Sequence, residues 1–191
     1  EGPEGPFKPH SEGPVTPPDW YALDGTLYVD ESGKPWMVFC HEWIQIGDGA
    51  MCAVRLSDDL SRAEGEPETL FHASAAPWGV ESTFEGKPGR VTDGPWIHRL
   101  EDGSLLMLWS TFGTGRDYMT GVARSRSGKI NGPWTVDPEP IYRDDGGHPM
   151  LFRSFDGQLI LVVHQPNKQQ RERARLFELI LENGDIALKA F

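Results

Sequence analysis

The chain has 191 residues, 38% of them hydrophobic and 10% aromatic, so it is long and apolar enough to fold around a core. Its formal net charge of −11 argues against nucleic acid or an anionic membrane surface as a partner, because both would repel it. The longest apolar runs have the length of single strands, so no transmembrane span is expected.

Residues 1–19 are crowded with Gly and Pro, which predicts an extended connection and no helix. Within this stretch Glu4-Gly5-Pro6-Phe7 is similar to Asn131-Gly132-Pro133-Trp134, which closes a later unit of the chain. By that similarity residues 4–8 are the tail of an earlier repeat. We therefore expect the chain to begin partway through a repeat array.

Three openers follow in chain order: Leu23-Asp24-Gly25, Thr92-Asp93-Gly94 and Gly147-His148-Pro149. Each opener precedes a short apolar run, a turn that ends in Gly, a second apolar run and a third one, which predicts antiparallel strands joined by hairpins. Repeated antiparallel units of this size indicate an all-β protein of the β-propeller type. The predicted blades span residues 20–91, 92–143 and 144–191.

Between the first two units lies a long stretch from Ser61 to Val91. We expect an outer strand over Glu68–His72 and a loop over the channel mouth for the rest, with a solvated surface insertion as the alternative. The charged segment 168–175 is expected to be a loop or at most one helical turn. Cys40 and Cys52 are predicted to be two buried free thiols, although a cross-strand disulfide is conceivable.

In a propeller the innermost strand of each blade begins at the rim of a central channel, so Asp24, Asp93 and His148 are predicted to be neighbours. The second strand of each blade runs back antiparallel and ends at the same mouth. The residues expected there are His41, Glu42, Trp43, Ser110, Phe112, His164 and Gln165. A cleft with acids, imidazoles and aromatic rings suits sugars, since rings take the apolar face of a sugar and polar groups take its hydroxyls.

Each opener also has a plain structural interpretation. Asp-Gly before a strand is a common turn, and a single His is more often hydrogen-bonded in a scaffold than a ligand. We favour function for Asp24 and Asp93 because they are taken to occupy the equivalent position of equivalent units. His148 is expected to face the channel, although one His without nearby carboxylates in sequence is a poor site for a hard cation.

These motifs resemble glycoside hydrolase family 43, whose members are five-bladed β-propeller enzymes. Residues 23–37, LDGTLYVDESGKPWM, are similar to the family segment I-D-P-x-x-F-x-D-D-D-G-K-x-Y-L that opens the third blade. Asp93-Gly94-Pro95 stands where the family has E-G-P, and Gly147-His148-Pro149 stands where it has G-H-G. The resemblance implies that this chain covers the C-terminal part of the propeller, about three blades, numbered three to five.

The resemblance also implies site residues for an inverting glycosidase. Asp93 would be the general acid, on a stem shorter than that of Glu by one methylene, about 1.5 Å; Glu81 and Glu85 are the alternatives. Asp24 would orient the acid and raise its pKa. The general base would lie in the first blade and so not in this chain. His148 would reach the channel centre, toward a calcium held through water, and no other cofactor is required.

The function implied is hydrolysis of arabinose-, xylose- or galactose-containing plant glycans, as in arabinofuranosidases, by a secreted or periplasmic enzyme. Because no base is expected within these 191 residues, the chain alone is expected to be inactive. A non-catalytic carbohydrate-binding propeller is the alternative. The expected partners are an oligo- or polysaccharide and, through exposed blade faces, the missing blades or a second chain.

Overall fold

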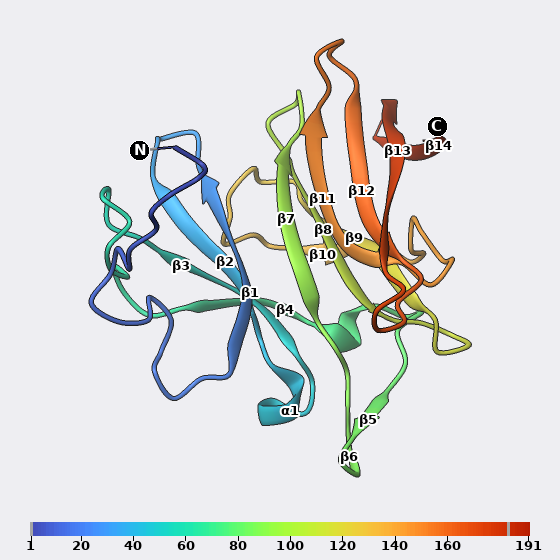
Figure 1. Cartoon of the computed structure of the whole chain (residues 1–191), viewed down its shortest axis with the longest axis horizontal. Coiled ribbons are helices and arrows are strands. Elements are labelled where there is room, and N and C mark those ends of the chain that lie inside the picture. The colour runs from blue at the N-terminus through green and yellow to red at the C-terminus, as the bar shows by residue number, and fades with distance from the viewer. Residues whose placement is uncertain (1, 183) are drawn as a thin grey trace.

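The computed structural model describes residues 2–182 and 184–191 and contains three four-stranded antiparallel sheets, each with its strands in sequence order (Figure 1). The first sheet holds β1 (Ala22–Val29), β2 (Pro35–His41), β3 (Ala50–Arg55) and β4 (Glu68–His72). The second holds β7 (Asp93–Arg99), β8 (Leu105–Phe112), β9 (Tyr118–Ser125) and β10 (Thr135–Val136). The third holds β11 (Gly147–Arg153), β12 (Leu159–Gln165), β13 (Arg173–Glu182) and β14 (Asp185–Ala190). The all-β, propeller-type prediction is confirmed.

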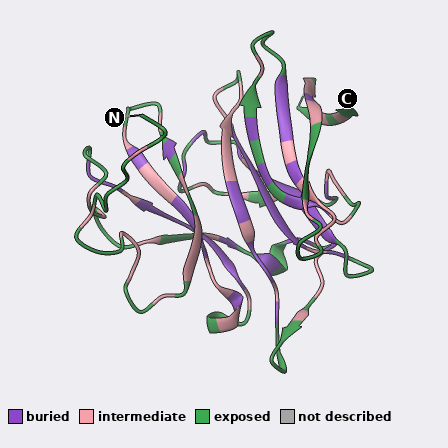
Figure 2. Ribbon diagram, viewed as in Figure 1, coloured by how far each residue is buried: buried purple, intermediate pink, exposed green. Residues whose placement is uncertain are grey.

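The long connection between the first and second sheets contains the predicted outer strand, because β4 spans Glu68–His72. The rest of it folds into a short 3-10 helix, η1 (Ala73–Ala75), and a small hairpin of β5 (Ser82–Phe84) and β6 (Lys87–Gly89). This hairpin projects from the body of the molecule (Figure 1), and most of it is exposed (Figure 2).

Two other local expectations need correction. Glu42 and Trp43 were expected at the end of the second strand, but β2 ends at His41 and a one-turn helix, α1 (Trp43–Ile46), follows it. The segment 168–175 is a turn only in its first part, because β13 already begins at Arg173 and pairs with Gln165. Within the described part of the chain, no helix has the length and apolarity to span a membrane.

The core lies between the sheets, and the middle sheet is buried on both faces. In β8 the side chains alternate: Leu105, Met107 and Trp109 pack toward the first sheet, and Leu106 and Leu108 pack toward the third. This alternation follows from the two-residue period of a strand. Figure 2 shows the result as nearly continuous buried ribbon through the central strands.

Apolar side chains on the outer sheets remain exposed. Leu27 and Val29 of β1 are about half exposed, and Met150 and Phe152 of β11 are exposed on either side of the buried Leu151. Against the first sheet, Val15 and Trp20 of the N-terminal segment pack on a third apolar cluster. Strand faces of this kind are hydrophobic surfaces that remain available for further packing.

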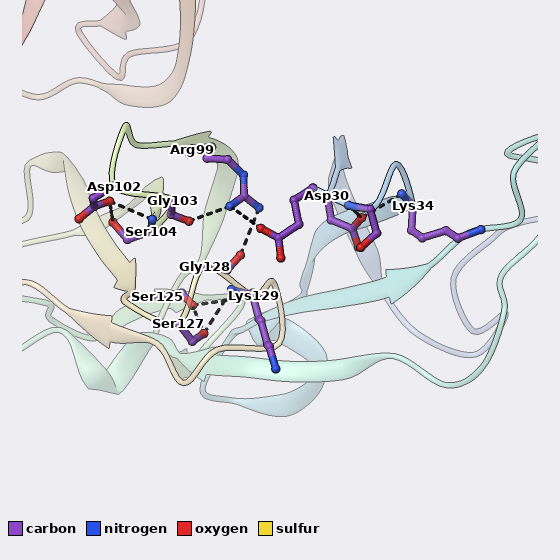
Figure 3. Close-up of polar contacts among 12 residues, drawn as sticks. Asp30, Lys34, Arg99, Asp102, Gly103, Ser104, Ser125, Ser127, Gly128 and Lys129 are labelled. Atoms are coloured by element: carbon purple, nitrogen blue, oxygen red, sulfur yellow. Dashed lines mark hydrogen bonds and ion pairs between the residues drawn. The ribbon is translucent and has the colours of Figure 1, made fainter.

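The first and second sheets are joined at their hairpin ends by Arg99 of β7. Its guanidinium donates to the carbonyl oxygens of Gly103 (2.7 Å) and Gly128 (3.2 Å) in its own sheet (Figure 3). It also donates to the hydroxyl oxygen of Tyr28 in β1, at 2.6 Å. Because a guanidinium has five donors in a fixed plane, one side chain can satisfy groups of both sheets.

Cys40 and Cys52 are free and buried, as predicted. Cys40 packs with Met51 and the other side chains between the first two sheets, whereas Cys52 lies in the cluster under the N-terminal segment. The two thiols therefore face opposite sides of the first sheet, which explains why they form no bridge.

The three openers share one backbone feature, a bulge in the first strand pair of each sheet. Two residues of the inner strand stand opposite one residue of its neighbour, and these pairs are Asp24-Gly25, Gly94-Pro95 and His148-Pro149. The first residue of each pair has a left-handed conformation, with φ of 56°, 56° and 55° in that order. Asp24, Gly94 and His148 are therefore the equivalent positions.

The prediction that Asp93 is equivalent to Asp24 is consequently wrong by one residue. Asp93 precedes its bulge and aligns with Leu23 and Gly147. The shared Pro of Asp93-Gly94-Pro95 and Gly147-His148-Pro149 was the sequence signal for this register. The offset lets the two carboxyl groups enter the same region from different backbone positions.

We expect Gly94→Ala to destabilise the protein more than Gly33→Ala does. Both glycines have positive φ, which costs an L-residue about 1–2 kcal/mol. A Cβ at Gly33 would meet open space, whereas a Cβ at Gly94 would lie 2.9 Å from the Cα of His148. The crowding should add roughly 1–3 kcal/mol. Urea unfolding of both variants measures the difference, and equal losses would contradict a tight Gly94–His148 contact.

Candidate active site

The structure brings the three openers together around the carboxylate of Asp24. Its Oδ2 accepts a hydrogen bond from the backbone N–H of Gly94 at 3.0 Å and lies 3.3 Å from Nε2 of His148. One carboxylate oxygen of the first sheet thus contacts the bulges of the second and third sheets. The predicted proximity of Asp24, Asp93 and His148 is confirmed by these contacts.

Asp93 is held from the other side by Tyr118, the first residue of β9. The Tyr118 hydroxyl donates to Oδ2 of Asp93 at 2.7 Å. Burial raises the pKa of Asp93 to about 6, and the nearby carboxylate of Asp24 adds to the rise, whereas the Tyr118 hydrogen bond opposes it. Asp93 is therefore a carboxylic acid that keeps its proton into the mildly acidic range.

The pKa of Asp24 shifts in the opposite direction to that of Asp93. Burial acts to raise its pKa, but the hydrogen bonds from His148 and from the Gly94 amide, with the charge on His148, outweigh burial and lower it. The hydrogen bond to Asp24 likewise raises the pKa of His148 above its ordinary value, although burial opposes this. The site therefore combines an ionised carboxylate with a neighbouring carboxyl that holds its proton, the pattern that separates acid from base roles in hydrolases.

Of the residues predicted at the end of β2, Glu42 is the one whose carboxyl group is influenced by the charge of Asp24. Burial raises its pKa, and the carboxylate of Asp24 contributes. Its Oε1 is buried and has no hydrogen-bond partner among the residues that the structure describes. His41 stacks on Trp20, with ring centroids 4.0 Å apart, and bonds Gln45 through Nε2 at 2.9 Å.

Trp43 is buried in α1, where its ring closely approaches the backbone of Gly89 in β6. Ser110 is fully buried and accepts a hydrogen bond from the backbone N–H of His148 at 2.9 Å. A role as a direct sugar contact does not fit this burial for either residue. Both instead support the elements around the site.

At the ends of β8 and β12, the predicted aromatic residues surround Tyr118. The Phe112 ring lies 5.2 Å from the Tyr118 ring, and the His164 ring stacks on it at 5.5 Å. His164 also hydrogen-bonds Asn167 through Nε2 at 3.0 Å. Gln165 donates to the side chain and carbonyl of Asp144 and so braces the loop before β11.

The alternative acids have other surroundings. Glu81 is exposed ahead of β5, and Glu85 is exposed at the turn of the β5–β6 hairpin. Tyr118, by contrast, was not predicted from sequence. It could have been found from the repeat, because the third strand of each unit begins where the second one ends, and Phe112 pairs with Tyr118 in the register.

A directly bound metal ion would need several side-chain ligands close together. In residues 2–182 and 184–191, no three His, Cys, Asp or Glu side chains are grouped so that they could hold one together. His148 directs Nε2 toward Asp24. These residues do not fit a directly ligated ion, and a calcium held through water near His148 stays a prediction.

Two hollows lie beside the second and third sheets, and neither is lined by Asp24 or Asp93. One of them, about 590 Å³, lies between the second and third sheets and is lined by Arg124, Asp137 and Asp185 among others. A smaller one of about 260 Å³ borders the site and is lined by His148, His164 and residues of β11 to β13.

Four-stranded antiparallel sheets that follow one another in the chain and each keep their strands in sequence order are the framework of a β-propeller. The sequence pattern of Glycosyl hydrolases family 43 matches residues 1–179. The chain belongs to this family. No curated protein matches it.

Solved structures agree with this membership. An endo-arabinase from Bacteroides thetaiotaomicron is 45% identical, with a TM-score of 0.93 over 96% of this chain and 65% of that one. An endo-1,4-beta-xylanase from the same organism is 19% identical, with a TM-score of 0.75 over 100% and 65%. A Cellvibrio cellulosa alpha-L-arabinanase complexed with arabinohexaose is 18% identical, with a TM-score of 0.60 over 89% and 57%. The last two show the shared fold, and the chain spans about 65% of the length of the endo-arabinase.

We expect Asp93→Asn to stabilise the protein at pH 8 and to have little effect at pH 4. The native state binds the Asp93 proton more tightly than the unfolded chain, so stability falls as the pH rises from about 4 through about 6. Asn has the same shape and never ionises, so it should remove a cost of about 1–3 kcal/mol at pH 8. Urea unfolding at both pH values measures this.

The matched control is Asp102→Asn. Asp102 is exposed, and its pKa is lowered by hydrogen bonds from Ser104, so its replacement should bring no gain at pH 8. A loss of stability in Asp93→Asn at pH 8 would show that the native state does not disfavour the ionised Asp93.

Proposed function

We propose that the chain forms the acid-bearing part of an inverting glycoside hydrolase that acts on arabinose-containing plant glycans. The observation that carries the proposal is the neighbouring pair of Asp24 and Asp93. Asp24 accepts a hydrogen bond from the amide of Gly94, the residue after Asp93, and the pKa of Asp24 is lowered whereas that of Asp93 is raised. Asp93 donates its proton to the glycosidic oxygen as the bond to the leaving sugar breaks. Asp24 stays ionised, and its charge helps Asp93 to keep the proton until then.

Inversion also needs a carboxylate that activates a water on the opposite face of the sugar, about 6.5–9.5 Å from the acid. Asp24 is engaged by His148 and the Gly94 amide and is not free for that role. We propose that the base is supplied by residues outside this chain. This agrees with the chain spanning 65% of the length of the endo-arabinase.

The substrate class rests on two supports. The endo-arabinase is 45% identical to this chain over the aligned part, whereas the xylanase is 19% identical, which favours arabinan-type glycans over xylans. At the site, the exposed His148 and the partly buried His41, Glu42 and His164 present polar groups near aromatic rings, a combination suited to sugar hydroxyls and ring faces. Because such polysaccharides lie outside cells, we place the protein in the periplasm or outside the cell.

In a form extended on the N-terminal side that hydrolyses arabinan, we expect Asp93→Asn to lower the rate on arabinan by about 10²–10⁴-fold. A dinitrophenyl arabinoside should lose far less, since its leaving group departs with little protonation. The measurement is kcat/KM on both substrates. Glu85→Gln is the control, because Glu85 is exposed on the hairpin, and its kinetics should stay near those of the unmodified protein.

If Asp93→Asn lowered kcat/KM equally on both substrates, Asp93 would not be the general acid. If Glu81→Gln or Glu85→Gln gave the leaving-group dependence instead, the acid would be a residue of the 61–91 connection.

For the 191-residue chain alone we expect no hydrolysis of aryl arabinofuranosides, because a proton donor without a base does not activate water. Calorimetric titration with arabino-oligosaccharides should accompany the assay. Turnover that Asp93→Asn abolishes would overturn the assignment of the base to residues outside the chain. Tight sugar binding that persists without hydrolysis in the extended form as well would favour a carbohydrate-binding propeller.

A further inference from the structure

We propose that Tyr118 is the positioning residue of the acid: its hydroxyl holds Oδ2 of Asp93, so that the proton to be transferred resides on Oδ1. This inference rests on the proposed role of Asp93. It concerns a residue in the third strand of its sheet, which the opener motifs do not include.

The contact between Tyr118 and Asp93 is short, and the tyrosine hydroxyl is the donor. The Tyr118 hydroxyl donates to Oδ2 of Asp93 at 2.7 Å. A carboxylic acid carries its proton on one of two oxygens, and an oxygen that already accepts a hydrogen bond is the poorer place for it. Oδ1 is then the donor oxygen, and the rotation of the carboxyl group about its last bond is fixed.

The tyrosine itself has little freedom to move. Only 2% of its surface is exposed, and its ring lies against Phe112 and His164. A Cβ on Gly147 would collide with the Tyr118 ring, so this glycine of the third opener lets the ring occupy its place. Asp145 accepts a hydrogen bond from the Tyr118 backbone N–H at 3.3 Å.

This arrangement acts on the reaction as well as on the ground state. When the proton leaves Oδ1 for the glycosidic oxygen, Asp93 becomes a carboxylate and Oδ2 gains negative charge. A hydrogen bond to a charged acceptor is roughly twice as strong as one to a neutral acceptor. Tyr118 therefore stabilises the product of proton transfer more than its reactant, which is the condition for lowering the barrier.

Tyr118→Phe tests the proposal in the 191-residue chain without any assay of activity. Carboxyl ¹³C resonances are followed by NMR from pH 3 to pH 9, and the Asp93 signal is identified by its loss in Asp93→Asn. Removing the donor to the ionised form should raise the apparent pKa of Asp93 by on the order of one pH unit. An unchanged or lowered value would overturn the proposal.

Tyr28→Phe is the matched control. Tyr28 is also a buried tyrosine whose hydroxyl contacts a charged side chain, Arg99, but it lies at the hairpin end of β1. Loss of its hydroxyl should reduce stability and leave the titration of Asp93 unchanged. If both variants shifted the Asp93 titration alike, a general loosening of the fold would explain the effect, and the positioning role would be wrong.

A second readout uses the extended, active form. Tyr118→Phe should lower kcat on arabinan by about 10-fold or more, and kcat on the dinitrophenyl arabinoside by much less, with KM little changed. Its alkaline pH limit should move upward, whereas Asp93→Asn abolishes that limit. If Asp93→Asn fails the leaving-group test while Tyr118→Phe still shifts the Asp93 titration, the proposed function is wrong and the contact alone stands.

Discussion

One carboxylate oxygen, Oδ2 of Asp24, is the point on which the arrangement of the site depends. It accepts the Gly94 amide and faces the His148 imidazole, so a single atom joins all three sheets. Burial of a charge is costly unless it is paired and hydrogen-bonded. Here the two partners outweigh that cost, as the lowered pKa of Asp24 indicates. The bulges are what make the contact possible, because they turn one residue per inner strand away from the ladder.

The same geometry explains why two aspartates in one cluster behave differently. Asp24 accepts hydrogen bonds from the His148 imidazole, which can carry a positive charge, and from the Gly94 amide. Asp93 is more deeply buried and accepts one from the neutral hydroxyl of Tyr118. The negative charge of Asp24 then acts on Asp93 and disfavours a second ionisation. Two carboxyls close together seldom ionise equally, and small differences in donors decide which keeps the proton. The raised pKa of Asp93 follows from the surroundings of the residue and not from its type.

Much of the fold could be predicted from the sequence because the same pattern of opener, strand, turn and strand occurs three times. The opener, the Gly turn and the alternation in residues such as 105–109 fix strand boundaries and faces together. The exact register of the openers was not readable in the same way, since Asp24-Gly25 and Asp93-Gly94 look alike but differ by one residue relative to their bulges. The repeat places Tyr118 at the start of a third strand, but its contact with Asp93 was missed. That contact and α1 both depend on tertiary packing, with Gly147 and Gly89 respectively. Periodicity carries no information about such contacts.

The repeated and the unique parts of the chain therefore contribute differently to the site. The charged groups stand on strand ends, where paired backbones and packed rings hold them rigidly, as reacting groups require. The unique segments, α1 and the β5–β6 hairpin, contact each other through Trp43 and Gly89 and extend away from the sheets. Glu42 links the repeated and the unique parts. Burial and the charge of Asp24 raise the pKa of the Glu42 carboxyl group, and the Glu42 backbone forms the N-cap of α1. In the proposed enzyme, changes in the unique segments would alter which glycan reaches the site and leave Asp24 and Asp93 in place, as is common where loops are carried on a rigid scaffold.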